Sequence, residues 1–166
     1  MAPWNALAVG LTDSDICSQV NKGEATFSDA YRETAEKIKE LVSYAEPNPY
    51  AYGYNDACTA FARGEAAMYP IGSYAIPQIK SVNPDMNIGS FTFPANDSEA
   101  DNVLNSGIDL QFSVLKESKN KEAAYEVLRF LYEDETIQIY LDDQGGIACK
   151  EGDFELAPEL EDMRSY

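Results

Sequence analysis

The sequence predicts a helix-rich α/β fold, because helical and strand-like patterns alternate along its 166 residues. Two segments repeat apolar residues at the spacing of one helix face: Tyr31, Ala35, Ile38 and Val42 in the first, and Ala124, Val127, Leu128 and Leu131 in the second. Four shorter runs have the length and apolar content of strands: residues 66–71, 88–93, 103–104 and 110–115. No internal repeat divides the chain, so one domain over residues 1–166 is expected.

The amino-terminal part begins with a short apolar segment, residues 3–11, which fits either a helix or a loop. Polar breaks follow at 12–14 and 21–23. Ser28 then stands where its hydroxyl can cap the first patterned helix. Within that helix Glu33 precedes Lys37 by four residues, which is the favourable order for an ion pair.

The middle of the chain begins with a loop, EPNPYAYGY, whose two prolines exclude a continuous helix over residues 46–54. A helical pattern then ends at Gly64, a residue that adopts the left-handed conformation at low cost. Further on, Ser118 or Asn120 is expected to cap the second patterned helix. A short helix should follow from Asp134 through Tyr140.

The turn after the strand-like run at 66–71 is the most informative feature of the sequence. Gly72 permits a tight turn, and the Ser73 hydroxyl can accept a hydrogen bond from the next helix. Tyr74 would then lie in the first turn of that helix, beside unpaired amide donors. A flat ring next to such donors suits a polyhydroxylated ligand, whereas the alternative is that Tyr74 packs against a neighbouring element.

Residues 61–74 have the pattern F-x-x-G-E-A-A-M-x-x-x-G-S-Y, which resembles a segment of extracellular solute-binding proteins of sugar ABC transporters, the maltodextrin-binding type. Three later segments resemble that family in the same order: NIGSFTFPA at 87–95, SGIDLQFSVLKESKNKEAAYEVLRFL at 106–131 and IQIYLDDQGGIACKEG at 137–152. Each motif is weak alone, but four in order make a specific signal.

The resemblance implies a periplasmic-binding-protein-like type II lobe that is incomplete relative to the two-lobe family fold. The chain would then be a fragment that covers mainly the carboxy-terminal lobe, with a return segment at about 65–115 that completes the other lobe. The implied function is the binding of a mono- or oligosaccharide for an ABC importer, without catalysis. Its partners would be the transmembrane permease subunits, and the parent protein would be extracellular and anchored to the membrane by a lipid.

By position in the family pattern, Tyr74 and Trp4 are the expected aromatic platforms of the ligand site. Asn5 and Asp109 are polar neighbours of those elements, and Ser73 precedes Tyr74 in the turn, so the expected ligand-binding residues are Trp4, Asn5, Ser73, Tyr74 and Asp109. The two rings supply platforms for sugar faces, and the polar side chains supply partners for hydroxyl groups. The family often has tryptophan at the position of Tyr74, which leaves the ligand's size open. Two alternatives also stay open: Trp4 belongs to the core, or Asp109 is a turn residue bonded to its own backbone.

Composition excludes several other functions. With 12 Lys and Arg against 29 Asp and Glu, the formal charge of −17 repels nucleic acids. The absence of histidine rules out Ser-His-Asp and Cys-His catalysis and histidine metal sites, and no phosphate-binding loop is present, so no cofactor or metal is expected. Three widely spaced cysteines, Cys17, Cys58 and Cys149, suggest partly buried free thiols rather than a zinc site.

Two functions of other classes remain as alternatives. A glycan-degrading enzyme domain would need a pair of carboxylates whose proximity the sequence does not reveal. A protein-interaction module would use the loop tyrosines Tyr50, Tyr52 and Tyr54. For the preferred function, this chain alone is expected to bind sugar weakly or not at all, and to form a homodimer through unpaired strand edges.

Overall fold

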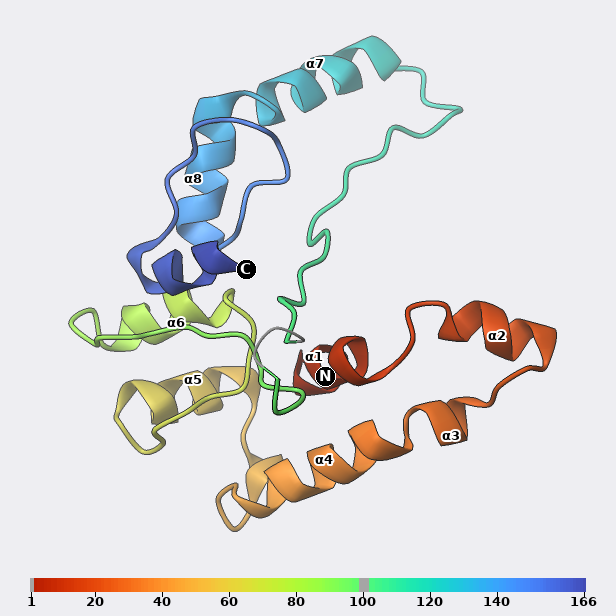
Figure 1. Ribbon diagram of the computed structural model, residues 1–166. Coiled ribbons are helices and arrows are strands. Elements are labelled where there is room, and N and C mark those ends of the chain that lie inside the picture. Colours follow the sequence, from red (N-terminus) through yellow and green to blue (C-terminus); the bar gives the residue numbers. More distant parts are fainter. Residues whose placement is uncertain (1, 99–101) are drawn as a thin grey trace.

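The computed structural model describes residues 2–98 and 102–166, and within them the chain consists of helices joined by loops (Figure 1). The α-helices are α1 (Ala2–Leu11), α2 (Ile16–Lys22), α3 (Phe27–Ala30), α4 (Arg32–Ser43), α5 (Tyr54–Ala62), α6 (Ala75–Val82), α7 (Lys121–Leu131) and α8 (Asp134–Gln144). The described residues also form 3₁₀ helices at Pro49–Ala51 and Pro158–Ser165.

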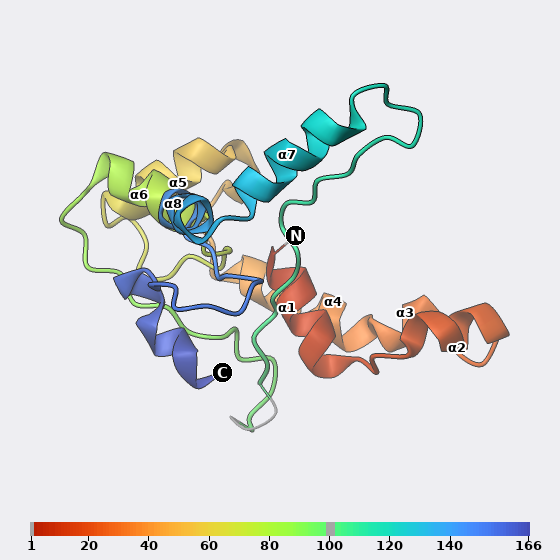
Figure 2. The same cartoon turned by 90° about the horizontal axis from the view of Figure 1, so that it is seen from above.

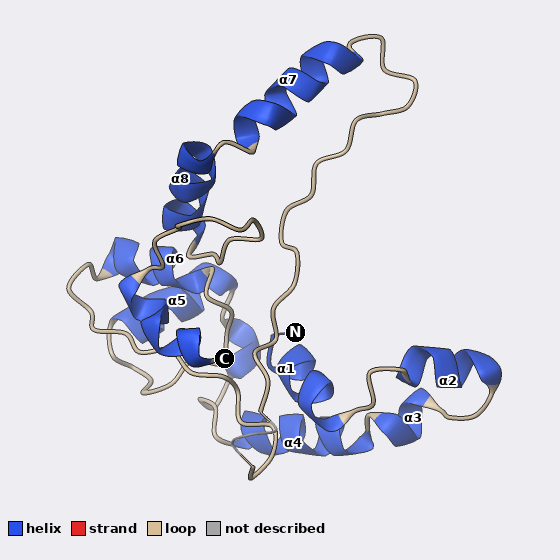
Figure 3. Cartoon of the chain, turned by 45° about the horizontal axis from the view of Figure 1, so that its top comes forward, coloured by secondary structure: helices blue, strands red, loops and turns tan. Residues whose placement is uncertain are grey.

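The expectation of an α/β fold is wrong for the described residues, which contain helices and loops but no strand (Figure 3). The runs at 66–71, 88–93, 103–104 and 110–115 are all loop segments. A strand is stable only when its backbone groups pair with those of a neighbour. No such pairing is recorded between described residues of these runs, so the prediction of a helix-rich chain is confirmed and that of strands is not.

The helix boundaries confirm most of the expected helices and correct their ends. Gly64 closes α5 with a positive φ of 77°, as expected. The hydroxyl that caps the helix before α4 belongs to Thr26, which accepts from the Asp29 amide at 3.2 Å, and not to Ser28. The helix from Asp134 continues past Tyr140 to Gln144, and α2 and the 3₁₀ helix Pro158–Ser165 were not expected.

The main core lies between α5, α6 and the 3₁₀ helix Pro158–Ser165. One buried cluster joins the first two helices: Cys58, Ala62, Ala75 and Ile79. A second joins α6 to the 3₁₀ helix: Ile76, Leu160 and Met163. Ile88 packs against both clusters, and each large apolar side chain buried in this way contributes on the order of 1.5–3 kcal/mol. This core supports the amino-terminal end of α6.

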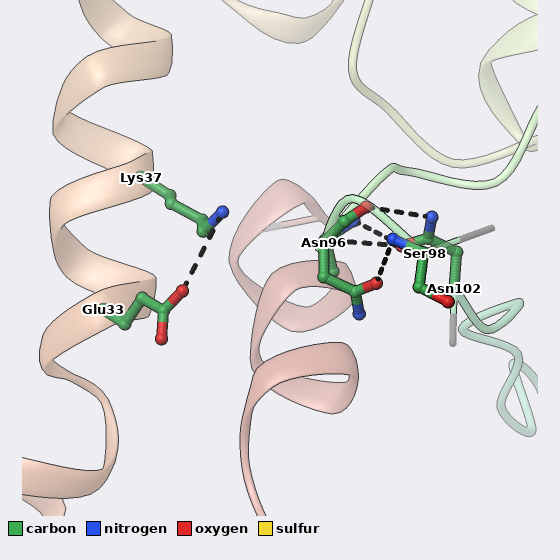
Figure 4. A network of polar contacts seen from close by, with 6 residues as sticks. Glu33, Lys37, Asn96, Ser98 and Asn102 are labelled. Atoms are coloured by element: carbon green, nitrogen blue, oxygen red, sulfur yellow. Dashed lines mark hydrogen bonds and ion pairs between the residues drawn. The ribbon is translucent and has the colours of Figure 1, made fainter. Parts of the chain in front are cut away.

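A second packed region joins α1 to α4, with Leu7 and Thr34 fully buried. Beside this region, the Asn102 side chain binds the backbone of residues 95 and 96. Its Oδ1 accepts from the amides of Ala95 at 2.7 Å and Asn96 at 3.2 Å (Figure 4). Ala95 is buried against Gly10 of α1, where an added Cβ would come within 2.5 Å of the Ala95 Cβ. The expected pair of Glu33 and Lys37 forms on α4, at 3.9 Å between exposed side chains.

Two parts of the molecule extend away from these packed regions (Figure 1; Figure 2). Helices α2 and α3 project on one side beyond α1 and α4. On another side, residues 103–115 run as an extended segment toward the start of α7. Four of its large apolar side chains are exposed: Ile108, Leu110, Phe112 and Leu115.

Candidate functional site

The rings of Tyr54 and Tyr74 lie together where α5 and α6 begin. Their centroids are 6.1 Å apart and their planes meet at 36°, while the Tyr54 hydroxyl donates to the Tyr74 carbonyl at 3.2 Å. Such ring pairs contribute about 0.5–1.5 kcal/mol beyond the area that they bury. Tyr54 remains 44% exposed and Tyr74 50% exposed, so parts of both rings are open to a ligand. We call these two residues the tyrosine pair.

Two glycines allow the chain to fold closely around this pair. A Cβ on Gly72 would lie 2.3 Å from Cε1 of the Tyr74 ring, so only glycine leaves that ring its present position. Gly145, at the end of α8, has a φ of 61°, and a Cβ there would lie 2.8 Å from the Ser73 carbonyl oxygen. The turn at 72–74 therefore rests on the end of α8.

The hydrogen bonds of this turn correct two expectations. No side chain caps α6; its N-cap is Tyr74, and Ser73 contributes its backbone carbonyl, which accepts from the Ile76 amide at 2.9 Å. The Ala75 amide donates to the Gly72 carbonyl at 3.0 Å, and Pro77 has no amide hydrogen. The amides of residues 75–77 are therefore not free donors, and the ligand-facing groups of this turn are mainly its rings.

Cys58 and Tyr69 are neighbours of the tyrosine pair, because the Cys58 thiol interacts with the hydroxyls of both Tyr54 and Tyr69. Burial, then the neighbouring Cys58 thiol, raises the pKa of Tyr69 to about 12. The same two causes, in the same order, raise the pKa of Tyr54, with a smaller contribution from Tyr74. The Tyr54 and Tyr69 phenols are consequently neutral at physiological pH, and each retains a hydroxyl hydrogen that it can donate.

Trp4 lies apart from the tyrosine pair in its recorded ring contacts. Its ring packs against Tyr31, at 5.9 Å between centroids and an angle of 51°, and Tyr31 in turn stacks on Phe27. Trp4 is 36% exposed, so it is neither fully buried nor free of neighbours. One aromatic group therefore joins Trp4 of α1 and Phe27 of α3 to Tyr31, which lies between α3 and α4, and it is separate from the tyrosine pair where α5 and α6 begin.

The remaining expected residues are spread over other elements. Asn5 is exposed on α1. Asp109, on the extended segment, accepts from the Tyr140 hydroxyl of α8 at 2.9 Å, and this hydrogen bond raises the pKa of Tyr140. Of the five expected residues, Trp4 and Asn5 are adjacent on α1 and Ser73 and Tyr74 are adjacent at the start of α6, in each case because they are neighbours in the sequence.

Tyr54 was expected only as a member of a tyrosine loop, and the structure gives it a different place. It is the first residue of α5, so its side chain projects from a helix end toward α6 rather than from a loop. Its neighbours Tyr50 and Tyr52 are exposed, at 87% and 42%. The available sequence signal was the helical pattern that follows Gly53, since helices often begin directly after such a residue.

Metal ligands, cysteines and membrane-spanning helices were also sought within residues 2–98 and 102–166. No group of three or more metal-ligating side chains gathers there. Cys58 is buried, as a small apolar residue would be, but Cys17 and Cys149 are exposed, which corrects the expectation that all three thiols are partly buried. None of the described helices combines the length and the apolar character that a membrane span requires.

Comparison with known proteins relates the chain to a family and to a sugar-binding protein. A family model described as bacterial extracellular solute-binding protein matches residues 2–138, which confirms the resemblance found in the sequence. The multiple sugar-binding protein of Streptococcus mutans serotype c is 33% identical over 99 residues. That match covers 60% of this chain and 23% of the relative, so the chain spans about a quarter of the relative's length. Both descriptions are of binding proteins.

Proposed function

Because the chain belongs to the family of bacterial extracellular solute-binding proteins, we propose that it binds a carbohydrate for an ABC importer and catalyses no reaction. The main observation behind this proposal is that Tyr74 is half exposed and lies within residues 2–138, which the family model matches. An aromatic face is what the C–H patches of a sugar ring pack against. The name of the Streptococcus mutans relative agrees with this class of ligand.

In this proposal Tyr74 is the principal platform, and Ser73 supplies polar groups beside it. Trp4, Asn5 and Asp109 belong to the same site in the complete protein. For them to meet a ligand held at Tyr74, the segments that carry them have to approach the turn at 72–74. Closure of two lobes around a ligand is a movement of that kind.

The proposal extends to the architecture of the complete protein. Residues 1–166 would form a type II lobe of the periplasmic-binding-protein kind, with residues 65–115 as the segment that returns to the other lobe. The exposed apolar side chains of residues 108–115 support this, since they suit burial against further chain. The strand-like pattern of that run would then find the backbone partners that it lacks here.

Partners and location follow from the same premise. The ligand-bound protein would deliver its sugar to the transmembrane permease subunits, outside the cytoplasmic membrane, and would be held there by a lipid anchor. Ligand binding would shift the protein toward the closed form that a permease recognises. Neither the described residues nor the comparisons support a homodimer, which is not part of the proposal.

Isothermal titration of the full encoded polypeptide with a panel of mono- and oligosaccharides tests this function. We expect at least one sugar to bind with micromolar affinity, and Tyr74→Ala to weaken that binding about tenfold or more, because the platform ring is lost. Lys121→Ala, at the start of α7, serves as a control that leaves the affinity unchanged. If no sugar gives a heat of binding, the ligand belongs to another class of solute.

A further inference from the structure

Gly145 ends α8 at the point where that helix meets the turn at 72–74. Its φ of 61° is left-handed, and the residue is buried. A Cβ at this position would lie 2.8 Å from the Ser73 carbonyl oxygen and 3.4 Å from Cδ of Pro77. A carbon atom that close to a backbone oxygen requires one of the two segments to move. Both the left-handed conformation and the close contact therefore require glycine here.

The end of α8 is fixed more firmly than the turn that it touches. Leu141 is only 6% exposed, and the Gln138 side chain accepts from the Glu155 amide at 2.9 Å and donates to the Glu155 carbonyl at 3.2 Å. The body of α6 is likewise held by the buried cluster around Cys58. Tyr74, in contrast, is half exposed. A side chain at position 145 would therefore displace the turn rather than either helix.

Such a displacement would act directly on Tyr74. The Ser73 carbonyl and the Tyr74 amide belong to one planar peptide unit, so moving the carbonyl turns the backbone from which the Tyr74 side chain projects. The same carbonyl accepts from the Ile76 amide at 2.9 Å, in the hydrogen bond that starts α6. The direction of the Tyr74 ring thus depends on how closely α8 approaches Ser73.

From this contact, and resting on the proposed function, we propose that Gly145 is a positioning residue of the ligand site. It offers no group to a ligand; the absence of its side chain allows α8 to support the turn at 72–74 and so sets the direction of the Tyr74 ring. Groups of a binding site act well only when they are held to within about 0.5 Å and 10–20° of the productive geometry. Gly145 meets this need although it lies far from Tyr74 in the sequence.

Gly23→Ala is the matched control for Gly145→Ala. Gly23 also ends a helix, α2, with a φ of 76°. No atom of the described residues other than those of its chain neighbours lies within 4 Å of a Cβ placed there. Both substitutions therefore strain the backbone in the same way, and only Gly145→Ala meets the turn at 72–74. A larger effect of Gly145→Ala on Tyr74 reports the contact itself.

The first measurement is fluorine NMR of the full encoded polypeptide labelled with fluorotyrosine, without ligand and with Tyr74→Phe for assignment. We expect Gly145→Ala to shift the Tyr74 resonance and Gly23→Ala to leave it in place, while circular dichroism shows unchanged helix content in both. Gly145→Asn, with Gly23→Asn as its control, is the second variant. Asparagine adopts the left-handed conformation more readily than alanine but still carries a Cβ, so it should shift the same resonance.

The second measurement is calorimetric titration with a sugar that the parent binds. We expect Gly145→Ala to weaken binding about threefold or more, and Gly23→Ala to change it by less than about twofold. The proposal is overturned if neither Gly145 variant shifts the Tyr74 resonance, if the Gly23 variants shift it equally, or if the ring shifts and the affinity stays the same. If the parent binds no sugar, the proposed function fails, and the fluorine resonance alone decides whether Gly145 positions Tyr74.

Discussion

At the scale of single residues, Thr34 is the polar side chain least well accommodated among the described residues. It is fully buried between α1 and α4, and its Oγ1 has no hydrogen-bond partner there. A buried hydroxyl without a partner costs about 1–3 kcal/mol, which is comparable to the gain from several good packing contacts. The α1–α4 packing is therefore less stable than its apolar contacts alone would make it.

Replacing this hydroxyl by a methyl group should stabilise the chain. We expect Thr34→Val to raise the free energy of unfolding by about 1 kcal/mol, because the shape is retained while the unsatisfied group is removed. Urea unfolding followed by circular dichroism measures the difference. Thr59→Val is the matched control: the Thr59 hydroxyl donates to the Asn55 carbonyl at 2.8 Å, so its loss should not stabilise. A lower midpoint for Thr34→Val than for the parent would contradict the prediction.

At the scale of elements, one ion pair connects the 3₁₀ helix Pro158–Ser165 to α6. Lys80 Nζ lies 2.8 Å from Glu159 Oε1, with 30% and 16% of the two side chains exposed. The same ammonium donates to the Met86 carbonyl at 2.8 Å. The hydrogen bond from Lys80 is the main reason why the pKa of Glu159 lies below its ordinary value of 4.5.

This pair should make stability depend on pH with a definite sign. A carboxyl whose pKa is lower in the folded state stabilises above the unfolded value of 4.5, and the contribution is lost as the pH falls through the folded value. We expect Glu159→Gln to lose on the order of 1 kcal/mol at about pH 7, and the difference from the parent to vanish toward about pH 3. Unfolding midpoints across this range measure it.

Glu161→Gln serves as the comparison for that series. Glu161 pairs with Arg164 at 2.7 Å on the exposed side of the same 3₁₀ helix, and its pKa is also lowered by that hydrogen bond. Water screens such exposed pairs, so this variant should change stability much less. If the two substitutions change stability equally at every pH, the partial burial of Glu159 does not strengthen its ion pair with Lys80.

At the scale of the whole molecule, stability is concentrated in the two packed regions and is low in the extended segment. Residues 103–114 form no backbone–backbone hydrogen bond with any described residue, and Phe112 is 58% exposed. Helices α5 and α6, in contrast, enclose the buried cluster around Cys58. Local opening should therefore differ strongly between these parts of one chain.

Limited proteolysis makes this difference measurable. We expect chymotrypsin to cut this chain first after Leu110, Phe112 or Leu115, because proteases require extended, exposed backbone. Phe61, a half-buried phenylalanine on α5, is the matched site and should be cut last. Mass spectrometry of the early fragments identifies the order. Early cleavage at Phe61 would mean that the core around Cys58 is not stable in solution.

Much of the helical structure was predictable because it depends on local interactions. The apolar spacing of residues 31–42 and 124–131 corresponds to α4 and α7, and Gly64 ends α5 as its conformational freedom suggests. The strands were predicted from apolar patterns just as the helices were, and that prediction was wrong. A strand depends on pairing with a second segment that can lie far away in the sequence. The capping role of Ser73 failed for a related reason, since backbone carbonyls took the amides that its hydroxyl was expected to bind.

Sequence alone determined the helix-rich character, the family and Tyr74 as a candidate platform, because each of these rests on residues close together in the chain. Only the tertiary structure decided that Tyr54 meets Tyr74, that Trp4 packs on Tyr31 and that Asp109 bonds to Tyr140. These contacts join residues that are 20, 27 and 31 positions apart. The way in which helices and loops pack on one another sets such distances, and no local pattern of residues encodes them.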